Sequence, residues 1–149
     1  MSQEVRECTK TFSAGAALVQ NRLVVLSSGV LQYADAYTTA IGTLEDTTFA
    51  SGDVVAVRLL PGEGTFKMMA SAAITSGAYV YQTASGKIDD VGFIPVGIAL
   101  EAASADGDII EVLPSRMIPD NVASVAAAGS AQGDAAAVTA GINTVSAAD

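Results

Sequence analysis

Short strand-like runs separated by turn residues form the dominant pattern of the chain. A ragged alternation of period two covers Glu4–Phe12. Branched apolar runs follow at LVVL (Leu23–Leu26), VVAVRLL (Val54–Leu60) and IIEVLP (Ile109–Pro114). Turn residues recur roughly every 8–12 positions, and no stretch before residue 119 combines a period of 3.6 with helix caps. The pattern therefore predicts an all-β fold, a small barrel or sandwich.

Two of the predicted strand pairs are hairpins. In the first, the LVVL run is followed by a turn at Ser27–Gly29 and by the segment VLQYA. The second is GAYVYQTASGKID (Gly77–Asp89), with its turn at Ala84–Lys87. A short turn that contains glycine between two strand-like runs favours antiparallel pairing. We therefore expect each hairpin to supply two neighbouring strands of a sheet.

Two similar strand–turn–strand segments follow the hairpins. IGTLEDTTFASGDVVAVRL (Ile41–Leu59) and VGIALEAASADGDIIEVLP (Val96–Pro114) begin 55 residues apart, at positions 41 and 96. A Gly-Asp pair precedes the last strand in both, and it suits a turn because glycine tolerates positive φ. The aligned identities are Gly42 with Gly97, Ala50 with Ala105, Gly52 with Gly107, Asp53 with Asp108 and Val57 with Val112.

The hairpins extend this similarity upstream at a different offset. An offset of 57 aligns Gly29 with Gly86, Leu23 with Val80 and Val30 with Lys87. We assign the two-residue difference between the offsets to a connecting loop. The interpretation is an internal repeat, residues 13–60 and 70–114, that arose by duplication. The alternative is that unrelated β segments reuse the same turns.

Three segments of the chain are expected to differ in role. Residues 1–12 form an N-terminal arm or the first strand, and residues 13–116 form the β body with its two related units. Residues 117–149 form a C-terminal arm or extension, which from Asn121 onward is rich in Ala and Gly and has no Lys or Arg. Glycines interrupt any helix there, so we expect this extension to pack on a neighbour or to act as a linker.

Composition adds the expectation of an assembly. Half of the 149 residues are apolar, but only 5% are aromatic and Trp is absent, so the core consists of small and branched side chains. A core with so few large side chains leads us to expect oligomerisation.

The net charge of −9 and the lack of a basic stripe argue against nucleic-acid binding, which depends on phosphate contacts. No apolar run approaches the ~18 residues of a membrane span, and the charged N-terminus does not resemble a signal peptide.

Residues that would support catalysis or metal binding are scarce. The chain has no His, and its single Cys, Cys8, completes no disulfide, metal or redox motif. Asp89–Asp90 and Asp106–Asp108 would suit a cation, but they lack the ligand order of a calcium loop, and a turn role is the stronger interpretation. PGEGTF (Pro61–Phe66) lacks the remaining elements of a phosphate loop. We predict a protein that is not an enzyme and has no cofactor or metal.

Three stretches resemble phage capsid decoration proteins, also called cement proteins. They are TKTFSAGAAL (Thr9–Leu18), SAAITSGAYVYQTASGKI (Ser71–Ile88) and PVGIALEAASADGDIIEVLP (Pro95–Pro114). The resemblance implies a small β-tulip body that forms a homotrimer on the outer surface of the virion, is made in the host cytoplasm and bridges subunits of the major capsid protein. A minimal cement protein would stop near residue 116. The segment that follows is similar to stretches of head-fibre and other virion surface proteins.

The resemblance also suggests contact residues. For the capsid they are in the N-terminal segment, which would otherwise be an ordinary first strand: Val5, Arg6, Thr9, Lys10 and Phe12. For the trimer interface they are apolar residues that would otherwise fill the core: Phe66, Met68 and Met69. The expected partners are the major capsid protein and other copies of the chain, without nucleic acid or membrane. The alternatives are a head-fibre or tail-associated base protein and a carbohydrate-binding adhesive module, for which aromatic side chains are few.

Overall fold

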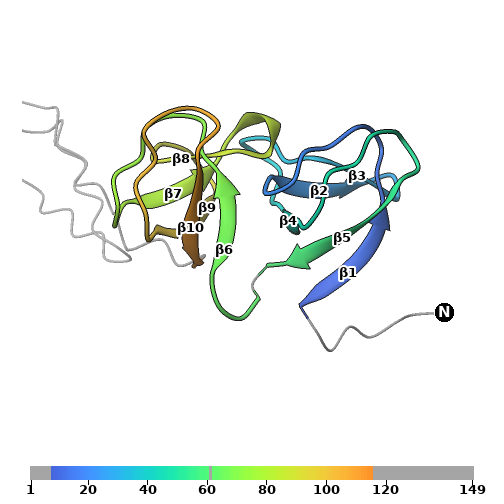
Figure 1. The fold of residues 1–149 in the computed structure, drawn as a ribbon, viewed down its shortest axis with the longest axis horizontal. Coiled ribbons are helices and arrows are strands. Elements are labelled where there is room, and N and C mark those ends of the chain that lie inside the picture. Colours follow the sequence, from blue (N-terminus) through green and yellow to red (C-terminus); the bar gives the residue numbers. More distant parts are fainter. Residues whose placement is uncertain (1–7, 61, 116–149) are drawn as a thin grey trace, which may run out of the picture. The chain divides into compact units, whose positions relative to one another are not determined.

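The computed structural model describes residues 8–60 and 62–115, which lie in one compact unit spanning residues 1–117. These residues form ten β-strands in two five-stranded antiparallel sheets (Figure 1). Within the described ranges the only helical segment is a 3-10 turn, η1 (Ala84–Gly86). The all-β prediction is therefore confirmed.

The first sheet contains the five strands of the N-terminal half, in the spatial order β1-β5-β4-β2-β3. Their bounds are β1 Thr9–Ser13, β2 Leu23–Ser27, β3 Val30–Tyr33, β4 Gly42–Leu44 and β5 Val54–Leu59. The second sheet has the order β6-β10-β9-β7-β8. Its strands are β6 Phe66–Met69, β7 Tyr79–Gln82, β8 Ile88–Asp89, β9 Pro95–Ala99 and β10 Ile109–Pro114.

The two sheets have the same topology, strand for strand. In each, the first strand pairs with the fifth, the fifth with the fourth, the fourth with the second and the second with the third. A parallel bridge then joins the end of the first strand to the third, Ala14 to Leu31 in one sheet and Ala70 to Ile88 in the other. The prediction of two related β units is therefore confirmed; we name them the first repeat (residues 8–60) and the second repeat (residues 66–115).

The shared Asp of the Gly-Asp pair builds the same turn in both repeats. The Asp53 carboxylate accepts hydrogen bonds from the backbone N–H groups of Phe49 and Ala50, at 2.8 and 3.0 Å. The Asp108 carboxylate does the same for Ser104 and Ala105, at 2.7 and 3.1 Å. A carboxylate that caps its own loop in this way fixes the entry into the last strand of each repeat.

The glycine that the fourth strands of both repeats share is required for a different reason, the close approach of a neighbouring strand. A Cβ atom at Gly42 would lie 2.2 Å from the carbonyl oxygen of Arg58, and one at Gly97 would lie 2.0 Å from that of Leu113. Both distances are far below van der Waals contact, so the fifth strand approaches the fourth too closely for any side chain.

The alignment of Leu23 with Val80 is wrong by one residue. Val24 pairs with Gly42, whereas Val80 pairs with the equivalent Gly97, so Val24 is the counterpart of Val80. The offset is therefore 56 in β2 and β7 and becomes 57 only from the hairpin turn onward.

One extra residue in the second turn accounts for this shift. Ser27 pairs with Val30 across a two-residue loop, whereas the N–H of Thr83 donates to the backbone carbonyl of Lys87 across a three-residue loop. The turn glycines keep the predicted match, because Gly29 and Gly86 both have positive φ, 83° and 68°. The later change from 57 to 55 lies in the connection between the third and fourth strands, as expected.

Two buried clusters form the core, one in each repeat. The first contains only residues of the first repeat: Ala14, Leu18, Val24, Leu31, Leu44, Val55 and Val57. The second contains the equivalent residues of the second repeat, and it also contains Leu23, Val25, Ala34 and Ala40 from the first. Strand β2 is thus buried on both faces, with Val24 in one core and Leu23 and Val25 in the other.

A buried glutamine joins the repeats by hydrogen bonds. Gln82 in β7 is 1% exposed, and its side-chain amide donates to the carbonyls of Asp35 and Thr38, at 2.5 and 2.6 Å. Its side-chain oxygen accepts from the N–H of Ala40, at 3.1 Å. One side chain of the second repeat therefore holds the whole β3–β4 connection of the first.

Replacing this glutamine by an apolar side chain tests that role. Gln82→Leu would remove the donor from two part-buried carbonyls and the acceptor from the buried N–H of Ala40, so we expect the free energy of unfolding to fall by about 2–4 kcal/mol. Gln32→Leu, at an exposed position of β3, is the control and should change it by less than about 0.5 kcal/mol. Urea unfolding followed by circular dichroism measures both, and equal values for the two variants would contradict the role of Gln82.

Candidate functional site

The N-terminal strand β1 carries three of the predicted capsid-contact residues. β1 is an edge strand of its sheet with β5 as its neighbour in the sheet order, and the parallel bridge from Ala14 to Leu31 lies just beyond its end. Thr9 is exposed, and Lys10 and Phe12 are half-buried. The Lys10 ammonium lies 5.7 Å from the centre of the Phe12 ring, within range of a cation–π contact. Two further predicted residues, Val5 and Arg6, lie outside the described residues.

The three predicted trimer-interface residues occupy different environments. Phe66 and Met68 are at most 1% exposed and belong to the core of the second repeat. Core filling therefore describes both side chains in the single chain. Met69 is half-buried, and its sulfur lies 3.3 Å from Nε of Arg22. The homotrimer remains a prediction, and of these three residues only Met69 has accessible side-chain surface.

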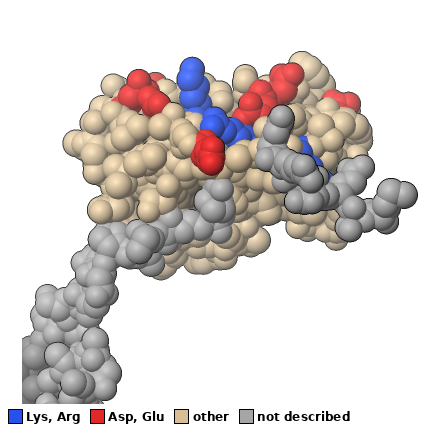
Figure 2. Space-filling model, turned by 90° about the horizontal axis from the view of Figure 1, so that it is seen from below, with Lys and Arg blue, Asp and Glu red and all other residues tan. Residues whose placement is uncertain are grey.

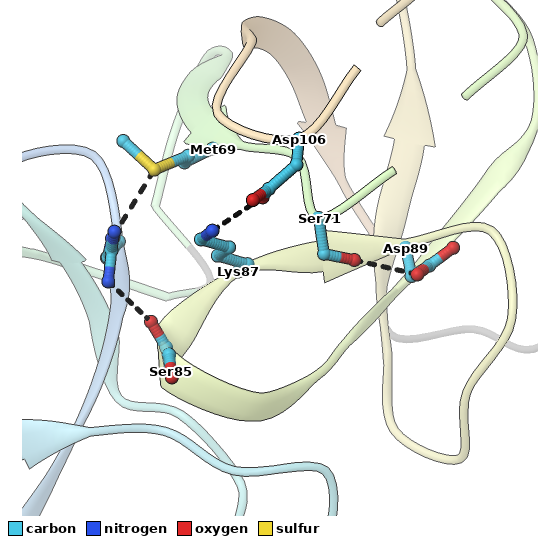
Figure 3. A network of polar contacts seen from close by, with 7 residues as sticks. Met69, Ser71, Ser85, Lys87, Asp89 and Asp106 are labelled. Carbon is cyan, nitrogen blue, oxygen red and sulfur yellow. Dashed lines mark hydrogen bonds and ion pairs between the residues drawn. The ribbon is translucent and has the colours of Figure 1, made fainter. Parts of the chain in front are cut away.

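Arg22 forms a second link between the repeats. Besides its contact with Met69 of β6, its Nη1 donates to the carbonyl of Ser85 in η1 at 3.4 Å, and its guanidinium lies over the Tyr33 ring at 4.9 Å. In Figure 3, Met69 and Ser85 lie on either side of the same arginine, while Lys87 reaches toward Asp106. These polar side chains are occupied by contacts within the chain, which indicates a structural role.

Several exposed apolar side chains escaped the sequence-based prediction. Tyr37 and Phe93 stack with their ring centres 5.4 Å apart, and both are largely exposed. Val91, in the same connection as Phe93, is 77% exposed. Large apolar side chains that group on a surface are candidates for an interaction site. The only signal in the sequence was their position in loop segments between predicted strands.

A cleft of about 680 Å³ lies between the repeats and is lined mostly by polar side chains. Arg58 donates to the carbonyls of Thr65 and Glu63, at 2.8 and 2.7 Å, and its guanidinium lies 4.2 Å from the centre of the Phe66 ring. The hydroxyl of Thr65 donates to the carboxylate of Glu111. These side chains of the cleft are therefore held by hydrogen bonds within the chain.

The described residues contain no group of three or more His, Cys, Asp or Glu side chains placed to hold a metal ion. Asp89, part of one candidate cation site, accepts a hydrogen bond from the Ser71 hydroxyl at 2.7 Å, as Figure 3 shows. Asp106, of the other candidate cation site, is paired with Lys87.

Among the described residues, no helix has the length and apolar character needed to cross a bilayer.

Charge is distributed without a single dominant stripe on the face shown in Figure 2. Blue basic and red acidic side chains lie next to one another along one margin, and most of the described face is neither. Two carboxyl groups of the described residues have a lowered pKa. Backbone hydrogen bonds from Tyr37 and Thr38 lower the pKa of Asp35, and the hydrogen bond from Lys87 lowers that of Asp106. Asp35 thereby organises the same connection that Gln82 holds.

Known phage proteins are similar to this chain in sequence and in fold. A family model described as phage cement protein matches residues 2–114. Among solved structures, the N base of the head fibre protein gp8.5 of bacteriophage phi29 has a similar fold, with a TM-score of 0.61 and 21% sequence identity. The similarity covers 72% of the present chain and 93% of that chain. No curated protein matches the sequence.

The lowered pKa of Asp35 predicts how stability depends on pH. Its contribution is complete above its ordinary pKa of 3.8 and is lost as the pH falls through the lower pKa of the folded state. Asp35→Asn removes this titration, so the stability difference between wild type and variant should shrink as the pH falls below about 4. Thermal unfolding at several pH values measures it. A difference that stays constant from about pH 6 to about pH 2 would exclude this linkage.

Proposed function

Since the chain belongs to the family of phage cement proteins, we propose that it decorates and stabilises the outside of a phage capsid by bridging major capsid subunits as a homotrimer. Membership of this family makes it a structural, capsid-associated phage protein. The outer surface as its location, synthesis in the host cytoplasm, the major capsid protein as its partner and the homotrimer are parts of the proposal.

The observation that carries the proposal is the extent of the family match. It spans residues 2–114, and thus both repeats of the β body. The described residues also suit a binding protein rather than a catalyst, because the cleft polar groups bond one another. A protein that reinforces a shell needs a stable body and surfaces for its neighbours, and both repeats supply buried cores for such a body.

The proposed capsid contact is the Thr9–Phe12 part of strand β1. Its edge position leaves one side of the strand without a partner strand in the sheet order, so a segment of a neighbouring protein can add there by backbone hydrogen bonding. Thr9 and Lys10 lie on this strand, next to the N-terminal residues Val5 and Arg6. Three such contacts in one trimer would reinforce one another, so each can be weak while the whole trimer binds firmly.

A matched pair of charge reversals tests this contact. Lys10→Glu on β1 should weaken binding to heads that lack the protein by about tenfold or more, because one unfavourable contact is repeated in every copy. Lys67→Glu is the control, since it makes the same change of charge on β6, the first strand of the second repeat. Co-sedimentation of the protein with purified heads measures both affinities.

The two variants separate a local contact from general electrostatics. Equal weakening by both would mean that net charge governs binding and that β1 is not the contact. If wild-type protein neither binds such heads nor raises their resistance to heat or osmotic shock, the proposed cement function is wrong.

A second candidate, the base of a head fibre, is favoured by the fold shared with the phi29 head fibre base and by the 34 residues that follow Ser115. The number of copies per virion distinguishes the two. A ratio near one to one with the major capsid protein, measured by quantitative mass spectrometry, is expected for a cement that covers the whole lattice. A few tens of copies would instead identify a fibre base.

A further inference from the structure

The two repeats differ in how their cores are covered. The core of the second repeat is completed by Leu23, Val25, Ala34 and Ala40 of the first repeat. The core of the first repeat contains no residue of the second. Because the repeats have the same topology, the first repeat has a surface equivalent to the covered one, and in the single chain that surface is open.

The open surface of the first repeat is recognised by comparing equivalent residues. Gln82 of β7 is 1% exposed, whereas its counterpart Leu26 in β2 is 46% exposed. A Cβ at Gly86 would lie 2.3 Å from the carbonyl oxygen of Leu23, but one at the equivalent Gly29 would meet nothing within 4 Å. We name this surface, formed by Ser13, Leu26, Ser28 and Gly29, the first-repeat open face.

The second repeat also has an open surface, and it is equivalent to the surface with which the first repeat covers the second. Its counterparts of the four covering residues are all apolar or ring-containing: Tyr79, Tyr81, Val91 and Pro95. Leu23 and Ala34 are at most 1% exposed, whereas their counterparts Tyr79 and Val91 are 40% and 77% exposed. We name this surface the second-repeat open face. It carries the apolar character of a covering surface, and in the single chain it covers nothing.

We propose that the second-repeat open face of one copy covers the first-repeat open face of the next copy, head to tail, as the first repeat covers the second within the chain. The occupant of each face is therefore another copy of this protein. The proposal deepens the homotrimer of the proposed function and rests on it. The intrachain contact is the template, because equivalent backbones with apolar residues at the equivalent positions can pack in the equivalent way.

Two backbone hydrogen bonds of the template have expected counterparts between copies. Within the chain, Gly86 N–H donates to the Ala34 carbonyl at 2.8 Å, and Met69 N–H donates to the Asn21 carbonyl at 2.9 Å. Between copies, Gly29 N–H would donate to the Val91 carbonyl, and Ser13 N–H to the Gly77 carbonyl. Gln82 has no polar counterpart, since Leu26 stands in its place, so the contact between copies is more apolar than its template.

Such a contact joins two different surfaces, and it therefore either closes into a ring or continues as a filament. In a closed ring of three copies, six repeats would follow one another, and contacts within and between chains would alternate. Each core of a first repeat would then be covered as each core of a second repeat already is. This explains why a chain with so few large side chains leaves apolar residues exposed at both ends of its pair of repeats.

Charged substitutions on either face test the proposal. Leu26→Asp and Val91→Asp should each abolish self-association of the full chain, because each would place an unpaired carboxylate in an apolar contact. Phe49→Asp is the control: Phe49 is the most exposed large apolar residue among the described ones, it lies on neither face, and its substitution should leave the assembly intact. Sedimentation velocity gives the oligomeric state, and circular dichroism confirms that each variant is folded.

Mixing the two variants distinguishes a head-to-tail contact from a symmetric one. Leu26→Asp keeps its second-repeat open face, and Val91→Asp keeps its first-repeat open face. An equimolar mixture should therefore form a one-to-one dimer and nothing larger, whereas each variant alone stays monomeric. Should Leu26→Asp fail to fold, Ser28→Asp provides a substitution on the same face at an exposed turn position.

The outcomes separate this inference from the proposed function. A monomeric wild type at high concentration, variants that still assemble, or a mixture that stays monomeric would each overturn the head-to-tail contact. Head binding by the monomeric variants, with reduced affinity, would show that the capsid-binding function holds independently of the assembly. Loss of head binding by Lys10→Glu without loss of assembly would show the converse, that the two surfaces are separate.

Discussion

Strand β2 packs into two cores at once, and the relation between the repeats depends on this arrangement. Val24 points into the core of the first repeat, while Leu23 and Val25 point into the core of the second. A strand of an antiparallel sheet that faces water on one side shows alternating polarity, and β2 does not. Separation of the repeats would expose one face of β2 to water, so burial of that face is the main force that holds the repeats together.

Polar contacts add direction to this apolar packing. Gln82 and Arg22 each connect one repeat to backbone or side-chain groups of the other. An apolar contact alone permits sliding, whereas hydrogen bonds to fixed carbonyls define one arrangement because an unpaired buried carbonyl is costly. The Asp35 carboxylate orders the connection that Gln82 contacts, so a surface charge and a buried amide act on the same loop.

The same architecture explains why the protein suits a structural role in a virion. Several of its described polar side chains are engaged in turns and in contacts between the repeats, and its exposed apolar side chains lie on strands and connections where neighbours can pack. A repeat that covers its neighbour on one side and is open on the other is a unit suited to assembly. Duplication of such a unit within one chain therefore leaves two unequal surfaces that are available to further copies.

Local constraints on the backbone were readable in the sequence, and they determined much of the fold. Gly42 and Gly97 mark strands that approach too closely for a side chain, and Asp53 and Asp108 mark turns closed by their own carboxylates, so the repeat and the strands were predictable. Only the tertiary structure decided that Gln82 is buried while Leu26 is exposed, and that Phe66 and Met68 fill a core. The physical reason is that burial depends on which distant segment covers a strand. The hydrophobic period of a sequence shows which residues share a face, but it does not show which segment packs against that face.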